Sequence, residues 1–152
     1  MQVRFTKLSD ARHGLEIVRR DGTREAVELE TRSLLLHDLV HFALESEAGL
    51  EQGFYGLLAS GTPLARLNQR EAPPASEQLA LIETLVGPAQ ALVNTQMSPE
   101  AYLAHARSLA PELVDAQLVE RLLERVRQLR GHWRATPYGA SMELDWPLKS
   151  GA

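Results

Sequence analysis

The sequence predicts an α+β fold in which a small antiparallel sheet packs against about five helices. Apolar and polar residues alternate in short runs over the first 30 residues, which is typical of strands. Helical spacing of apolar residues then extends from about residue 31 to residue 130, and strand-like alternation returns over residues 142–146. A lone C-terminal strand needs a partner, so we expect it to join the N-terminal strands in one sheet. The length, 152 residues, is typical of one domain, and we expect residues 1–152 to form a single globular domain.

The N-terminal strands are expected to form a hairpin around the Asp-Gly turn signal at residues 21–22. Successive side chains of a strand alternate between faces, so the loop length decides which apolar residues meet. A two-residue loop would place Val27 and Leu29 on the opposite face from Ile17. A loop with an odd number of residues instead pairs Ile17 with Val27 and Leu15 with Leu29, and we predict this register.

Capping residues, glycines and prolines divide the middle of the chain into helices. Gly87-Pro88 is expected to break or kink one of them, because proline lacks the backbone donor and clashes with the preceding turn. Small residues at 53, 56 and 60 give the second helix a smooth face, which we interpret as close packing against a neighbour and not as a ligand contact. The first helix is expected from Thr31 or Ser33 to about Ala48, and the second over residues 51–60, followed by an irregular connector over residues 61–75. Later helices are expected to begin at Glu77 after a Ser76 cap and at Ser98-Pro99-Glu100. The last helix is expected from Pro111 or Asp115 to Arg130, before Gly131.

The segment with the most chemical information begins at residue 36 with Leu-His-Asp-Leu-Val-His. His37 and His41 stand four residues apart on a predicted helix, so both imidazoles lie on one face, one turn apart. Many zinc sites present two imidazoles in this way. The stretch His37-Asp38-Leu39-Val40-His41 resembles the His-Glu-x-x-His motif of zinc peptidases, with Asp38 in the place of the glutamate base. The resemblance covers five residues, and no second motif of those families follows, so the chain is not assigned to them.

Glu45 is the third candidate ligand on the same helix. It lies eight residues from His37, a rise of roughly 12 Å, so a straight helix does not easily bring both onto one ion. In this interpretation His37, His41 and Glu45 bind a divalent metal such as zinc, and Asp38 transfers protons. The competing interpretation is a polar helix face whose histidines bond to their neighbours. A complete site would need help from another element, for which the candidates are His13, His105, His132 or a distant carboxylate.

Composition narrows the classes of function. The chain has no cysteine, which excludes disulfides and thiolate metal sites. Its formal net charge of −4 argues against nucleic-acid binding. A run of arginines near the end of the last helix is interpreted as an offset to the helix dipole. The N-terminus lacks the apolar core of a signal peptide, and no apolar run approaches ~18 residues, so no membrane association and a cytoplasmic location are expected.

Two classes of function remain at this point. The favoured one is a non-enzymatic interaction or regulatory protein with an unidentified protein partner and no evident cofactor, because no complete catalytic set is present. The alternative is a metal-binding protein or metal-dependent hydrolase built on His37 and His41. No feature of the sequence indicates an oligomeric state.

Overall fold

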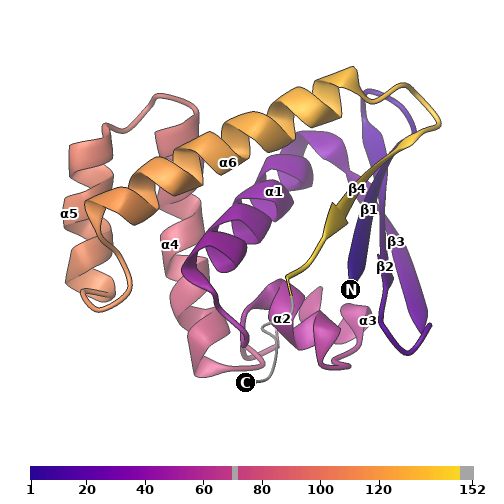
Figure 1. Cartoon of the computed structure of the whole chain (residues 1–152), viewed down its shortest axis with the longest axis horizontal. Coiled ribbons are helices and arrows are strands. Elements are labelled where there is room, and N and C mark those ends of the chain that lie inside the picture. The colour runs from indigo at the N-terminus through magenta and orange to yellow at the C-terminus, as the bar shows by residue number, and fades with distance from the viewer. Residues whose placement is uncertain (70–71, 148–152) are drawn as a thin grey trace.

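A four-stranded antiparallel sheet and a set of helices make up this α+β protein, as the sequence predicts (Figure 1). The computed structural model describes residues 1–69 and 72–147. Its elements in chain order are β1 (Gln2–Lys7), β2 (Arg12–Val18), β3 (Arg24–Glu30), α1 (Thr31–Ala48), α2 (Phe54–Ala59), α3 (Leu64–Leu67), α4 (Glu77–Val93), α5 (Pro99–Leu109), α6 (Ala116–Ala135) and β4 (Ser141–Asp145). No helix within the described residues is long and apolar enough to cross a membrane.

The C-terminal strand joins the N-terminal sheet, which confirms the predicted partnership. The strand order is β3-β2-β1-β4, and β4 runs antiparallel to β1 with Phe5 opposite Met142. Both side chains are fully buried, together with those of Val3, Leu15 and Ile17 on the same face of the sheet. This apolar face packs against the helices and forms one side of the core.

The predicted register of the hairpin is wrong by two residues, although the predicted face is right. Leu15 lies opposite Val27, and Ile17 lies opposite Glu25. The loop has an odd number of residues, as predicted, so Val27 shares the face of Leu15. The pairing is shifted because Arg19 N donates to the carbonyl of Thr23, so the turn is centred on Asp21 and not, as the predicted pairs require, on Gly22.

Side-chain hydrogen bonds and an ion pair explain why the hairpin adopts this register. Within the turn, the Asp21 carboxylate accepts hydrogen bonds from both the backbone N and the hydroxyl of Thr23. The Arg19 guanidinium pairs with Glu25 at 2.6 Å and donates to the carbonyl of Leu58. These polar contacts tie the hairpin to α2, and the apolar matching that we used for the prediction does not include them.

Most helix boundaries follow the capping residues. Gly49, with φ of 66°, ends α1 in the left-handed conformation, and the Ser76, Ser98 and Asp115 side chains cap α4, α5 and α6. Thr31 and Ser33 do not cap α1, since its cap residue is Glu30 and makes no side-chain bond. The connector of residues 61–75 contains the short α3, which the sequence did not suggest.

Two helices continue past residues where a break was one of the predicted outcomes or a helix end was predicted. The helix α4 continues through Pro88, because Leu85 and Ala89 on either side of it belong to one buried stripe whose packing offsets the missing hydrogen bond. The helix α6 continues through Gly131, since Leu129 and Trp133 both pack against the core and a single glycine costs only about 1 kcal/mol.

The central helix α1 positions the candidate site. It contacts α2, α4, α6, β2 and β3, so it has buried residues on most of its circumference (Figure 1). The side of α1 that carries His37 and His41 faces α4, and the same side borders a pocket.

Candidate metal centre

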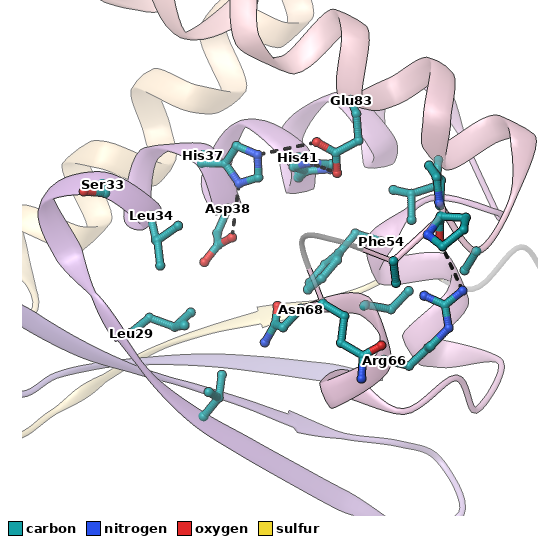
Figure 2. Close-up of a pocket in the computed structure, with 18 residues that line it drawn as sticks. Leu29, Ser33, Leu34, His37, Asp38, His41, Phe54, Arg66, Asn68 and Glu83 are labelled. Carbon is teal, nitrogen blue, oxygen red and sulfur yellow. Dashed lines mark hydrogen bonds and ion pairs between the residues drawn. The ribbon is translucent and has the colours of Figure 1, made fainter.

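A pocket of about 680 Å³ lies between α1, α4, β3 and the segment around α3 (Figure 2). One wall is polar and carries ionisable side chains from two helices. The remaining walls are largely apolar, with side chains from β3, α1, α2, α3 and α4. The polar wall consists of His37, Asp38, His41 and Glu83, and the apolar lining includes Val27, Leu29, Leu34, Phe54, Leu67 and Leu79.

Two imidazoles and one carboxylate converge in this polar wall. The Nε2 atom of His41 lies 3.2 Å from Oε1 of Glu83, and Nε2 of His37 lies 3.7 Å from Oε2 of the same carboxylate. One ligand atom from each residue falls within 4.8 Å of the other two. A tetrahedral ion with bonds near 2.0–2.1 Å separates its ligand atoms by ~3.3 Å, so small side-chain rotations would bring this set onto one ion.

Each histidine has a second carboxylate behind its other ring nitrogen. Nδ1 of His41 is 2.8 Å from Oε2 of Glu45, and Nδ1 of His37 is 3.6 Å from Oδ1 of Asp38. A carboxylate on Nδ1 holds a proton there and orients the ring so that Nε2 is the atom available to a ligand. Both Nε2 atoms therefore face Glu83 while both Nδ1 atoms are backed by acids, as Figure 2 shows for His37.

Glu45 is enclosed in the protein and held on three sides. Its side chain has no exposed surface, and besides His41 it accepts hydrogen bonds from the backbone N–H groups of Phe54 at 3.0 Å and Tyr55 at 2.9 Å. These donors are the first residues of α2, so Glu45 also satisfies N–H groups that the helix itself leaves unpaired. The close approach requires Gly53, since a Cβ there would lie 2.4 Å from the carboxylate. The interpretation of this glycine as a packing residue is confirmed.

Asp38 connects the site to the sheet. Its Oδ2 atom faces Nε2 of His13 at 3.9 Å, and neither atom has a hydrogen-bond partner among the described residues. The His13 ring is fully buried on β2 and contacts the hydroxyl of Thr31 through Nδ1. The backbone carbonyl of Asp38 accepts a hydrogen bond from Tyr55, which fixes this turn of α1.

The ionisable side chains of the cluster shift one another's pKa values. Burial acts to lower the pKa of His41, but the carboxylates of Glu45 and Glu83 outweigh burial and raise this pKa to about 9. Contacts with Asp38 and then Glu83 raise the pKa of His37. The two histidines hold the pKa of Glu83 well below its usual range. Burial would raise the pKa of Asp38, but His13 and His37 lower it, so Asp38 is an anion.

The predicted site residues divide into three groups. His37, His41 and Asp38 line the pocket, whereas Glu45 lies behind His41 and contributes to the site through that ring. His13 contacts Asp38 from the sheet. His105 on α5 and His132 on α6 are exposed and do not line the pocket.

Glu83 is the residue that the sequence analysis did not single out. It lies on α4, four residues after Leu79, which also lines the pocket. Its carboxylate is about half exposed, as expected for an acid on an amphipathic helix. Nothing local distinguishes it from the other acids of the chain, and only the packing of α4 on α1 reveals it.

Comparisons with protein-family models, with curated proteins and with solved structures returned no match for this chain. The chemistry of the cluster is therefore what indicates a function. Two imidazoles and one carboxylate beside a cavity match the ligand set of catalytic zinc sites, which keep one position open.

Proposed function

We propose that this protein binds a divalent transition-metal ion through His37, His41 and Glu83, and that it is a metal-dependent hydrolase whose substrate occupies the adjoining pocket. The observation that carries the proposal is the arrangement of the two histidines. Both Nε2 atoms point toward one carboxylate, and both Nδ1 atoms have an acid behind them. A polar helix face needs only that its histidines have partners, and does not require this common orientation.

A second feature supports metal binding over a purely structural ion-pair network. The Nε2 atom of His41 is buried, and its 3.2 Å contact with Glu83 lacks the alignment of a hydrogen bond. A buried polar atom without a well-aligned hydrogen bond gains free energy from a better-placed partner. A metal ion between this nitrogen and the Glu83 carboxylate would give both atoms a ligand bond.

The pocket supports the hydrolytic part of the proposal. A metal ion held by His37, His41 and Glu83 would lower the pKa of a water molecule and so supply a nucleophile at neutral pH. Asp38 lies on the pocket wall as an anion beside His37 and is the proposed proton acceptor. The expectation of a separate protein partner stays a prediction.

Zinc binding by the purified protein tests the proposal. Isothermal titration calorimetry of chelator-treated protein should give one equivalent of zinc, and the thermal midpoint should rise because only the native state assembles the ligands. His41→Ala should abolish binding, and Glu83→Gln should weaken it by at least about tenfold.

His105→Ala is the matched control, because His105 is an exposed histidine outside the pocket. This variant should bind zinc like the wild type. Absence of stoichiometric zinc, nickel or manganese binding in the wild type, together with an unchanged thermal midpoint, would exclude the proposed site. Equal loss of binding in His105→Ala would show that the histidines bind zinc without forming a specific site.

A further inference from the structure

The pocket beyond the metal ligands has its own chemistry. Its volume of about 680 Å³ is in the range of pockets that hold small organic molecules, roughly 300–1,000 Å³. Leu29 and Val27 of β3 form part of its lining, together with Leu34 of α1 and Leu67 of α3. These side chains offer an apolar surface of the kind that binds the hydrocarbon part of a ligand.

Arg66 is the only lysine or arginine among the described residues that line the pocket. It lies on α3, across the pocket from His37 and Glu83 (Figure 2). Its Nη2 atom donates to the carbonyl of Pro73 at 3.1 Å, and no ion pair joins Arg66 to an acid within residues 1–69 and 72–147. A guanidinium has five N–H donors in a planar fork that suits a carboxylate or phosphate group, and the bond to Pro73 uses one of them.

The two ends of the pocket differ in their charge. At one end the carboxylates of Asp38 and Glu83 are paired with His37 and His41, whereas at the α3 end Arg66 carries a positive charge. An anionic group on a ligand is attracted by the guanidinium. Arg66 therefore offers an anchor for an anionic group at the end of the pocket opposite the histidines.

We propose that the substrate is an amphiphilic organic anion, with its carboxylate or phosphate on Arg66, an apolar middle against the β3 and α1 leucines, and its scissile group at the His37–His41–Glu83 corner. The proposal rests on the proposed function for the position of the reacting group. The recognition of the anion depends on Arg66 alone and is tested separately from metal binding.

Ligands of nearly the same shape but different charge show how much the negative charge contributes to binding. Binding of phenylbutanoate to the zinc-loaded protein is compared by NMR titration with binding of the neutral phenylbutanamide, which has nearly the same shape. The carboxylate should bind about tenfold more tightly, since a hydrogen bond to a charged group is stronger than one to a neutral group. Phenylpropylphosphonate forms the third arm, and the tighter of the two anions identifies the head group.

Two variants decide whether Arg66 is responsible. In Arg66→Gln the carboxylate and the amide should bind with equal affinity, while zinc affinity stays at the wild-type value. Arg107→Gln is the control, because Arg107 is exposed on α5 and does not line the pocket. It should keep the preference for the anion.

The outcomes separate the two proposals. A preference for the anion that survives in Arg66→Gln would show that the metal itself holds the carboxylate, and would overturn the assignment of Arg66. No preference in the wild type, or no binding of any of the three compounds, would overturn it as well. If zinc does not bind but the anion preference is present and lost in Arg66→Gln, the hydrolase proposal fails while recognition of the anion by Arg66 stands.

Discussion

Replacement of Gly53 by alanine tests whether the buried Glu45 holds the site together. The backbone at Gly53, with φ of −84° and ψ of −169°, is extended and suits alanine, so any effect comes from the added methyl group. An ideal Cβ at this position lies 2.4 Å from Oε1 of Glu45 and 2.8 Å from Cδ1 of Ile82. Both neighbours are fully buried, and the carboxylate cannot move without loss of its hydrogen bonds to His41 and α2.

The size of the effect follows from those bonds. Displacement of Glu45 affects three donors, and a buried donor left unpaired costs about 1–3 kcal/mol. Because the chain relaxes in part, we expect the free energy of unfolding to fall by about 2–4 kcal/mol. Zinc affinity should fall about 10–100-fold, since His41 loses the partner of its Nδ1 atom. Urea denaturation followed by circular dichroism measures the first effect, and calorimetric zinc titration measures the second.

Gly131→Ala is the matched control. Gly131 lies within α6, and a Cβ there meets nothing within 4 Å. Alanine in a helix interior is more favourable than glycine by about 0.5–1 kcal/mol, so this variant should be slightly more stable than the wild type. A Gly53→Ala protein with wild-type stability and wild-type zinc affinity would refute the reasoning, because it would show that Glu45 is not confined as the structure has it.

Two further predictions concern pH and the C-terminal strand. Because the pKa of His41 is raised to about 9, zinc must displace a proton from Nε2 at neutral pH. The affinity of the protein for zinc should therefore rise about tenfold per pH unit from pH 7 to about 9 and then level off. Zinc titrations at several pH values check this prediction, and an affinity that does not change with pH would contradict it. Truncation after Ala140 removes β4 with the buried Met142 and also Trp146, each worth ~1.5–3 kcal/mol of burial, so the thermal midpoint should drop by at least about 6 °C in scanning calorimetry. An unchanged midpoint would mean that β4 contributes nothing to the core.

The sequence predicts the features that depend on neighbours along the chain. The caps at Ser76 and Ser98 act within one turn of helix and are where the sequence puts them, and Asp115 is one of the two predicted starts of the last helix. The common face of His37 and His41 follows from helical periodicity alone. The hairpin prediction fails at the point where distant contacts matter, since Arg19 and Glu25 bond to residues of α2 and α3 that apolar matching does not consider.

The candidate site also depends on contacts between residues that lie far apart in the sequence. Glu83 stands 42 positions after His41 and reaches it only because α4 packs on α1. The sequence predicts the need for a ligand from another element, but many acids of the chain fit that description equally. The sequence identifies Glu45 as a candidate ligand. It does not predict the hydrogen bonds between Glu45 and the first residues of α2, because these depend on the turn at Gly53. Local sequence patterns therefore do not predict side-chain contacts that depend on tertiary packing.

The two histidines are not equivalent, and the difference indicates how the site is organised. His41 is buried and has a short 2.8 Å bond to a carboxylate that is itself held by two backbone donors, so its ring is fixed before any ligand arrives. His37 is about one-third exposed and lies 3.6 Å from Asp38, which leaves its ring free to rotate toward the pocket. If both histidines bind an ion as proposed, a rigid ligand beside an adjustable one would let the surrounding side chains adjust to a substrate, while His41 would keep the ion anchored to the core. The acid that makes this possible, Glu45, also holds the start of α2, so the anchor of the proposed site is part of the fold itself.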